Sequence, residues 1–512
     1  MISRCCRSFF AVLVLVTISI PIFAATRPPT IGSVSAVRQL PNGLQFRSGD
    51  ALVRITLVSP GIFRIRCTAR PDFPPDHAFA VIPQPQSPEA YIKTTQSATA
   101  LKLDDGSVVV TVNRASGLIS IADKNAPIIV DQPDRPATWN GEGFRIYKTM
   151  TPLEAFHGLG DKSDGMNHRG NAYTDWNTDA YGWQQGTDPL YKSIPFFIGM
   201  TDNLTAFGVF LDNTYRTSFD FGKESNSYFS FGADGGELNY YFIAGPTPKQ
   251  VVERYTALTG RTPLPPLYAL GFQQSRYSYY PEARVRQIAD EFRARKIPCD
   301  VLYLDIDYQQ DYKPFTIDRE RFPRFEQMVK DLGNEGFKLV LISDLHIKKE
   351  AGYPPYDEGT AHDYFVKNPD GSQYVGRVWP GPSVFPDFTL TPVRKWYGSL
   401  YKMFTGMGVA GFWNDMNEPS VFRYPQKTMP LATVHRVDAG TEDRSPSGPA
   451  RSTDHREIHN VFGMENVRAT HDGLLALRPN ERPFVLTRAA FAGTQRYAAT
   501  WTGDNSATWV HY

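Results

Sequence analysis

The chain has few cysteines and no charge of one sign in excess, and each shortage excludes a class of protein. Only 4 of its 512 residues are cysteine, and Cys5 and Cys6 lie at the extreme N-terminus, so a disulfide framework is excluded. Cys67 and Cys299, far apart in the chain, are expected to be buried free thiols. With 54 basic against 53 acidic residues, no net field would attract a polyanion, so nucleic acid is not expected as a partner.

Several reaction classes also lack their sequence signatures. The chain contains no glycine-rich phosphate cradle, no G-x-S-x-G serine elbow and no H-E-x-x-H zinc helix. His455 and His459 are spaced four apart, but for this pair a surface or helix-packing role is expected rather than metal binding. Neither a metal nor an organic cofactor is expected.

Long apolar runs are missing except at the N-terminus. There Arg4 and Arg7 precede an apolar stretch over residues 9–21, and Ala24 and Ala25 follow it. This pattern predicts a signal peptide over residues 1–25 and export to the periplasm or the medium. The run is short for a permanent transmembrane helix, so no stable membrane insertion is expected after cleavage.

Residues 26–262 show a pattern with period two. Apolar residues alternate with polar ones in the segments 51–58, 107–112 and 207–211, and turn pairs such as Asp105-Gly106 separate such segments. Alternation of this kind, with frequent turns, predicts an antiparallel β-sandwich.

After the proline-rich stretch Pro263–Pro266, short apolar strands alternate with amphipathic helices. One helix places Val285, Ile288, Ala289 and Phe292 on a single face. The expected strands are Ala269–Gln273, Val301–Leu304, Leu339–Ile342, Val409–Trp413, Phe484–Leu486 and Ala498–Trp501. Two long connections, 348–391 and 419–454, are expected to roof a site.

A charged residue closes each of the last five strands: Asp305, Asp344, Asp415, Arg488 and Asp504. A (β/α)8 barrel gathers such strand ends around one pocket, although a doubly wound open sheet would also collect a ligand there. Six β/α units are visible, so residues 263–512 are expected to form an incomplete (β/α)8 TIM barrel. For any one aspartate, helix capping is the simpler explanation.

Two of these carboxylates suit the hydrolysis of a glycosidic bond. The reaction needs one carboxyl group at the anomeric carbon and another that protonates the departing oxygen, and Asp415 and Asp504 fit these roles. Asp415 lies between Trp413 and Met416 with Glu418 nearby, surroundings that perturb a pKa.

Other residues offer sugar contacts. Arg488 could bind vicinal hydroxyls, hold a carboxylate or form a structural salt bridge. Asp305 could accept bonds from a pair of sugar hydroxyls, and Asp307 could point the same way. The rings of Trp413, Trp501 and Trp379 could stack on a pyranose or fill the core.

Combined, these residues match a known family. The chain resembles glycoside hydrolase family 31, the α-glucosidase family, from about residue 150 onward and more weakly before it. The motif Trp413-Asn-Asp-Met-Asn-Glu418 matches the signature W-x-D-M-N-E. Further matches are Leu304-Asp-Ile-Asp-Tyr308, Phe385-Pro-Asp-Phe388, Leu486-Thr-Arg488, Trp501-Thr-Gly-Asp-Asn505, Gly158-Leu-Gly-Asp161 and Asp188-Pro-Leu-Tyr-Lys-Ser-Ile-Pro-Phe196.

The resemblance implies a role for each matching residue. Asp415 would be the nucleophile of a retaining mechanism, and Asp504 the general acid and then the general base. Asp305 and Arg488 would bind hydroxyls of the cleaved sugar, and Trp413, Met416 and Trp501 would wall its subsite. Asp179, in Trp176-Asn-Thr-Asp179, would reach the neighbouring subsite from an N-terminal-domain loop.

The expected function is hydrolysis of terminal α-linked glucose from an oligosaccharide or α-glucoside. An α-xylosidase, α-galactosidase or transglucosylase on the same scaffold, or an inactive fragment, are the alternatives. Family members usually have Met where Gln309 stands, and they continue past the acid/base loop with two further barrel units and C-terminal β-domains. A truncated product is therefore expected, and linkage preference and oligomeric state stay open.

Overall fold

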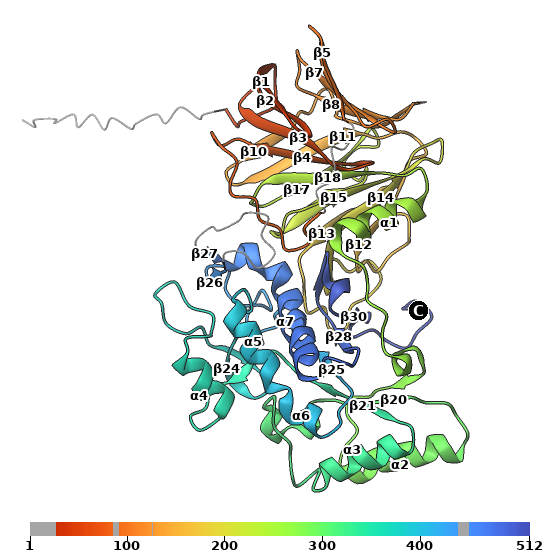
Figure 1. Cartoon of the computed structure of the whole chain (residues 1–512), viewed down its shortest axis with the longest axis vertical. Coiled ribbons are helices and arrows are strands. Elements are labelled where there is room, and N and C mark those ends of the chain that lie inside the picture. Colours follow the sequence, from red (N-terminus) through yellow and green to blue (C-terminus); the bar gives the residue numbers. More distant parts are fainter. Residues whose placement is uncertain (1–26, 85–91, 125, 439–449, 512) are drawn as a thin grey trace, which may run out of the picture.

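The computed structural model describes residues 27–84, 92–124, 126–438 and 450–511, and the expected signal peptide lies outside them. An all-β part, formed by the N-terminal half, sits above an α/β part formed by the C-terminal half (Figure 1). A stretch without helix or strand, residues 261–266, follows the last helix of the upper part and contains the expected junction.

The upper part consists of three sheets whose internal pairings are antiparallel, as expected for a β-sandwich. One sheet has the order β1-β2-β3-β4-β18-β15-β14-β12, a second β10-β11-β17-β16-β13, and a third β5-β6-β7-β8-β9. The strands are β1 Val34–Leu40, β2 Gly43–Ser48, β3 Ala51–Ser59, β4 Ile62–Thr68, β5 Lys93–Gln96, β6 Ala100–Asp104, β7 Val109–Asn113, β8 Ile119–Ala122, β9 Pro127–Val130, β10 Thr138–Asn140, β11 Gly143–Thr149, β12 Ala155–Gly160, β13 Ala172–Asp175, β14 Lys192–Met200, β15 Ala206–Leu211, β16 Thr217–Asp220, β17 Tyr228–Ala233 and β18 Leu238–Ala244.

The period-two pattern becomes burial of alternate residues. Along β7 the side chains of Val110 and Val112 enter the core while their neighbours are partly exposed. Strand β15 is buried on both faces, because helix α1 (Pro248–Thr259) packs on the side of the sheet opposite the sandwich core. Alternation is lost where a strand has no solvent face.

The lower part is built on a parallel sheet with the order β19-β20-β21-β25-β28-β30. Its strands are β19 Gln273–Gln274, β20 Val301–Leu304, β21 Lys338–Ile342, β25 Gly411–Asn414, β28 Val485–Thr487 and β30 Ala499–Thr500. Each strand pairs with the next one of this series along the chain, whereas a doubly wound sheet would reverse direction at a switch point. The expected incomplete (β/α)8 barrel is confirmed.

The first barrel strand differs from its expected position. Leu267–Leu270 forms a 3-10 helix, and strand β19 begins only at Gln273. The expected strand was Ala269–Gln273, but within it Leu270 and Phe272 are exposed, and only Gln273 belongs to the observed strand. Apolar runs this short do not distinguish a strand from a helical turn.

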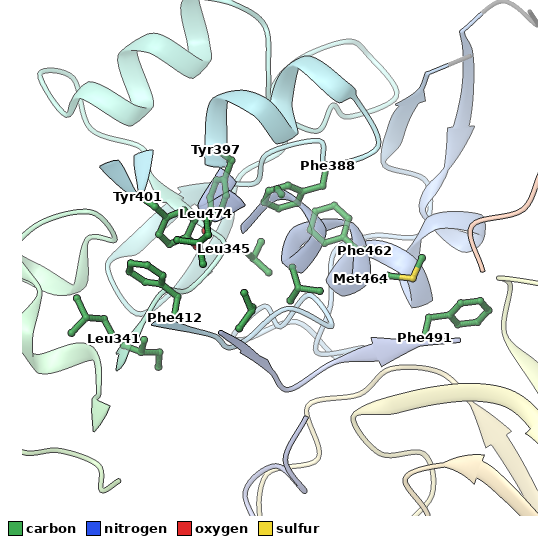
Figure 2. Packing of buried hydrophobic residues seen from close by; sticks show 14 of the residues in the cluster. Leu341, Leu345, Phe388, Tyr397, Tyr401, Phe412, Phe462, Met464, Leu474 and Phe491 are labelled. Carbon is green, nitrogen blue, oxygen red and sulfur yellow. The ribbon is translucent and has the colours of Figure 1, made fainter. Parts of the chain in front are cut away.

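Helices of the lower part pack around the parallel sheet, whereas α4 contacts strand β22 (Ile347–Lys348) of a smaller sheet. They are α2 Glu282–Ala294, α3 Phe325–Asn334, α4 Pro354–Ala361, α5 Thr391–Leu400, α6 Lys402–Gly406 and α7 His455–Leu477. Figure 2 shows the core between them: Phe412 from β25 and Leu341 from β21 lie near Tyr397 and Tyr401, with Phe462 of α7 beyond. This core fixes the strands whose ends carry the charged residues.

Both long connections contain regular structure of their own. The first forms the small sheet β22-β24-β23, with β22 Ile347–Lys348, β23 Gly376–Val378 and β24 Gly381–Val384. The second forms the hairpin of β26 Val434–Val437 and β27 Arg451–Asp454. A last short strand, β29 Ala490–Phe491, leaves the barrel and pairs with β14 of the upper part.

Two expectations about the remaining side chains and helices can be compared directly with the fold. Cys67 and Cys299 are buried free thiols, as expected, and burial raises the pKa of each. None of the helices in the described part of the chain is both long and apolar enough for a bilayer crossing.

Candidate active site

The charged strand ends meet at one edge of the parallel sheet. Asp415 follows β25, Arg488 follows β28, and Asp504 lies in the loop after β30. The Arg488 guanidinium joins the two aspartates: its Nε lies 3.0 Å from Asp415 Oδ1, and its Nη1 lies 3.1 Å from Asp504 Oδ2. The structure thus brings together the two carboxylates expected to act on one bond.

Arg488 is enclosed by protein groups. It makes a two-point contact with Glu418, at 2.8 and 2.9 Å, and its Nη2 lies 3.7 Å from Asp179 Oδ1 and 3.2 Å from Met416 Sδ. With its side chain 2% exposed, the guanidinium is bound mainly to carboxylates. Of the roles expected for Arg488, this geometry favours holding carboxylates in place; its contact with sugar hydroxyls stays a prediction.

Burial dominates the electrostatics of this cluster. It raises the pKa of Asp415 to about 7, a shift that Arg488 opposes and that Glu418 and Asp504 increase. Burial likewise raises the pKa of Glu418, again opposed by Arg488. The pKa of Arg488 is raised well above its usual value, because the attraction of Asp415 and Glu418 outweighs the effect of burial. Four carboxyl groups, those of Asp179, Asp415, Glu418 and Asp504, surround this one guanidinium.

Asp305 lies at the same edge of the sheet. Asp307, which could have pointed the same way toward a sugar, does not share that role. Asp305 caps the 3-10 helix Ile306–Tyr308, and its Oδ1 accepts a hydrogen bond from the Ile306 amide at 2.7 Å. Burial, reinforced by Asp307 and Asp504, raises the Asp305 pKa to about 7. Asp307 is paired with Arg321 at 2.8 Å, because the helical turn ends the strand and removes the alternation on which a shared direction would depend.

The expected aromatic wall is assembled in part. Trp413 and Trp501 meet edge to face, with ring centroids 5.3 Å apart, and the buried Nε1 of Trp413 has no hydrogen-bond partner among the described residues. Met416 is buried beside Arg488. Trp379 stands apart: it is 42% exposed at a turn, and the ring of Phe422 lies 5.0 Å away.

Asp179 reaches the cluster from the upper part, and its role at a neighbouring subsite stays a prediction. Its Oδ2 accepts a hydrogen bond from the Ser420 hydroxyl at 2.8 Å, and its backbone carbonyl accepts one from Lys427. Gln309 lies farther back: it is 1% exposed, and its amide contacts the hydroxyl of Tyr308 at 3.4 Å. Gln309, where family members usually have Met, is thus packed against Tyr308 and the end of strand β21.

Sequence reasoning had given no role to several residues at this edge. Tyr191 is fully buried, with its hydroxyl 3.4 Å from Asp504 Oδ2 and its ring centroid 5.0 Å from the Arg488 guanidinium carbon. Glu418 had been noted only as a neighbouring charge. Tyr191 could have been found from its place inside the motif that begins at Asp188.

Asp344 and His346 form a second unassigned pair. Asp344 lies two residues after the end of strand β21, is fully buried, and has an Oδ1 atom without a hydrogen-bond partner among the described residues. Burial, with Asp415 and Asp305 adding to it, raises its pKa well above the usual value. The ring nitrogens of His346 also have no hydrogen-bond partner in the described part of the chain, although Nε2 lies 3.9 Å from Asp344 Oδ2, and burial lowers the pKa of His346 to about 3. Its position after a predicted strand was the only feature of the sequence that pointed to Asp344.

His455 and His459 are buried within helix α7 rather than on the surface. The His435, His455 and His459 rings form a chain, with nitrogen separations of 3.0 and 3.1 Å, and His459 Nε2 contacts the Asn177 carbonyl at 2.7 Å. This is the helix-packing role that the spacing allowed. Across the described residues, no group of three His, Cys, Asp or Glu side chains is arranged to hold a metal ion.

Comparisons with known proteins agree with this geometry. A family model described as "Glycosyl hydrolases family 31 TIM-barrel domain" matches residues 262–512. Another, described as "Glycosyl hydrolase 31 N-terminal galactose mutarotase-like domain", matches residues 52–220. Alpha-glucosidase 2 of Bacillus thermoamyloliquefaciens is 41% identical over 483 residues, which cover 94% of this chain and 59% of that protein.

Solved structures share the fold of this chain. A family 31 dextranase of Flavobacterium johnsoniae, in complex with isomaltotriose, has a TM-score of 0.85 at 33% identity over 93% of this chain and 56% of its own. The alpha subunit of glucosidase II has a TM-score of 0.82 at 26% identity, over 96% and 61%. The chain spans about three fifths of the length of these relatives. The resemblance carried by the motifs is confirmed, and the chain belongs to glycoside hydrolase family 31.

Proposed function

We propose that this chain carries the catalytic carboxylates of a retaining α-glucosidase, which hydrolyses terminal non-reducing α-linked glucose in carbohydrate metabolism. The observation that carries the proposal is the pair of contacts from one guanidinium to Asp415 and Asp504, at 3.0 and 3.1 Å. Two carboxyl groups held this way can act on opposite sides of one glycosidic bond.

Double displacement assigns a different task to each aspartate. Asp415 attacks the anomeric carbon and forms a glycosyl ester, while Asp504 protonates the departing oxygen. Asp504 then removes a proton from water, and the water oxygen displaces Asp415, so that the α-configuration is retained. Two carboxyl groups and water suffice for these steps.

The surroundings of the two aspartates suit these tasks. The Asp415 side chain is 11% exposed, so water has little access to the nucleophile, whereas the Asp504 side chain is 41% exposed and can exchange protons with solvent. Positive charge develops on the sugar in the transition state. The excess of carboxylates around Arg488 stabilises that charge.

Glucose is favoured as the bound sugar by the relatives named as α-glucosidases. Asp305 would bind its hydroxyls, Trp413, Met416 and Trp501 would wall it, and Trp379 and Asp179 would contact the next unit. An α-xylosidase, an α-galactosidase or a transglucosylase could use the same carboxylates. Aryl glycosides of each sugar and analysis of transfer products separate these alternatives.

Replacing Asp415 with Ala tests the mechanism. Turnover of 4-nitrophenyl α-glucoside should fall by roughly 10³-fold or more, because no nucleophile remains. Asp307→Asn is the matched control: this strand-end aspartate is paired with Arg321, so most of the activity should survive. Near-normal turnover by the Asp415 variant, or equal loss in the control, would contradict the assignment.

Trapping identifies the nucleophile independently. A 5-fluoro α-glucosyl fluoride should label the peptide containing Asp415, and NMR of the first product should show the α-anomer. A label on another residue would reassign the nucleophile, and a β-anomer would exclude retention.

Export is part of the proposal and rests on the N-terminal pattern of Arg4, Arg7 and the apolar run after them. The mature chain should begin near Ala25 and be recovered from the periplasm or the medium. N-terminal sequencing of the protein from its host checks this, and an intact Met1 would exclude cleavage.

A further inference from the structure

The first residues of strand β14 belong to the upper β-part yet lie against the candidate active site. Lys192 and Ser193 of β14 pair in parallel with Ala490 and Phe491 of β29. Strand β29 begins two residues after Arg488, so this pairing ties the start of β14 to the residues that bind the two aspartates. Lys192, and Tyr191 just before it, therefore lie where the barrel and the sandwich meet. We call this contact region between the two parts the seam.

Tyr191 contacts Asp504 at both its backbone and its side chain. The Tyr191 hydroxyl accepts a hydrogen bond from the Asp504 amide at 3.3 Å and donates one to Asp504 Oδ2 at 3.4 Å. Its ring also lies beside the Arg488 guanidinium carbon, with 5.0 Å from that carbon to the ring centroid. A cation against an aromatic face adds a further favourable contact. The buried side chain of Tyr191 thus restrains both Asp504 and Arg488.

Lys192 holds the same loop at its other end. Its Nζ donates to the Trp501 carbonyl at 2.5 Å and lies 2.5 Å from Asp161 Oδ2. The lysine side chain is 8% exposed, and Asp161 fixes its ammonium group from the sandwich side. A charged donor with little freedom is a strong positional restraint.

Gly503 explains how the loop comes so close to Tyr191. A Cβ at position 503 would lie 2.2 Å from the Tyr191 ring, and the backbone there has φ of +74°. The backbone at Gly503 therefore approaches the Tyr191 ring closely, so the loop is shaped to this residue of the sandwich part.

We propose that Tyr191 and Lys192 are positioning residues, which hold residues 501–504 so that the Asp504 carboxyl group faces the leaving-group oxygen. The proposal rests on the proposed function, and it assigns to the sandwich part a share in acid catalysis. The chain from Asp161 through Lys192 to Trp501 sets the start of the loop, and the Tyr191 hydroxyl sets its end.

Substrates that differ in their need for a proton test this role. In Tyr191→Phe the ring against Gly503 and Arg488 remains, and only the hydroxyl is lost; Lys192→Met keeps the length of the side chain. For maltose, whose leaving group needs a proton, kcat/KM should fall about 10-fold in either variant. For α-glucosyl fluoride, which needs far less acid assistance, the loss should stay below about 2-fold.

Tyr240→Phe is the matched control, because Tyr240 is a buried sandwich tyrosine whose hydroxyl accepts a hydrogen bond from Lys148. Its kcat/KM should change equally little for both substrates. If Tyr191→Phe lost the same factor on both substrates, or lost nothing on maltose, Tyr191 would have no positioning role.

Hydrogen exchange gives a measurement that needs no turnover. Amides in peptides spanning residues 499–506 should exchange at least about 5-fold faster in Tyr191→Phe and Lys192→Met than in the parent or in Tyr240→Phe. Unchanged exchange would overturn the proposal. If the parent chain cleaved neither substrate, the proposed function would fail, and the exchange rates alone would decide whether these residues hold the loop.

Discussion

At the scale of single residues, the candidate site concentrates carboxylates around one arginine. Asp179, Asp415, Glu418 and Asp504 all lie within 3.7 Å of Arg488. Burial raises the pKa of Asp415 to about 7; Arg488 opposes this shift, whereas Glu418 and Asp504 add to it. A group that must be ionised to attack a sugar is thus held where ionisation is costly.

Asp415→Asn should therefore separate stability from activity. Because the folded-state pKa exceeds the usual value of 3.8, the folded state binds the proton more tightly than the unfolded chain. The ionised Asp415 then lowers the free energy of unfolding increasingly as the pH rises from about 4 to about 7. The neutral asparagine avoids this loss, so its melting temperature relative to the parent should be higher at pH 8 than at pH 5.

Thermal unfolding of the parent and Asp415→Asn at the two pH values measures this difference. Turnover should be nearly abolished in the same variant. Asp331→Asn, on helix α3 far from the cluster, is the control and should show no rise from pH 5 to pH 8. A larger relative stability of Asp415→Asn at pH 5 than at pH 8 would mean that Arg488 outweighs burial at Asp415.

At the scale of elements, helix α7 shows what a sequence pattern can and cannot predict. The His455 and His459 spacing indicated a helix, and a helix runs from His455 to Leu477. The burial of both histidines could not be predicted, because their partners include the Asn177 carbonyl, 282 residues away in the chain. The buried polar side chain of His459 is thus satisfied by a group that is distant in the chain.

His459→Phe should destabilise the fold by about 1–3 kcal/mol, because it leaves the Asn177 carbonyl and a His455 nitrogen without their partner. The stacking of Trp176 on the ring, at a centroid distance of 3.7 Å, should persist in this variant and isolate the hydrogen bonds. Urea unfolding measures the loss. His471→Phe, on the same helix, should cost less, and an equal cost would remove the special role of His459.

Strands and site differ in how much the sequence alone determines. The apolar run Val301–Leu304 predicted the bounds of strand β20 correctly. The strand ends that carry charged residues meet at the common edge of the parallel sheet. The segment from Ala269 was misassigned, because its apolar residues lie exposed on a turn. The enclosure of Arg488 was also beyond prediction, since it depends on Tyr191 and Asp179 from another part of the chain.

At the scale of the whole molecule, the change of pattern near residue 262 separates two folds but not two independent functions. Asp179, Tyr191 and Lys192 of the upper part contact the strand ends of the lower part. Strand β29 of the lower part extends a sheet of the upper part. Contacts between distant segments have no local signature, so composition and periodicity do not reveal how the two parts share the site.

The seam should make the two parts unfold together, and Asn460 is the residue on which this depends. Its side chain accepts from the Asn177 amide at 2.9 Å and donates to the carbonyls of Thr214 and Tyr215 at 3.2 and 3.1 Å. Calorimetry of the chain should show one transition, with calorimetric and van't Hoff enthalpies equal within about 10%. Asn460→Ala removes these bonds between the parts and should split or broaden the transition, whereas Asn334→Ala, at an exposed helix end, should not. Two transitions in the parent chain would mean that barrel and sandwich unfold independently. The sandwich residues would then be unable to hold the acid/base loop against thermal motion of the seam.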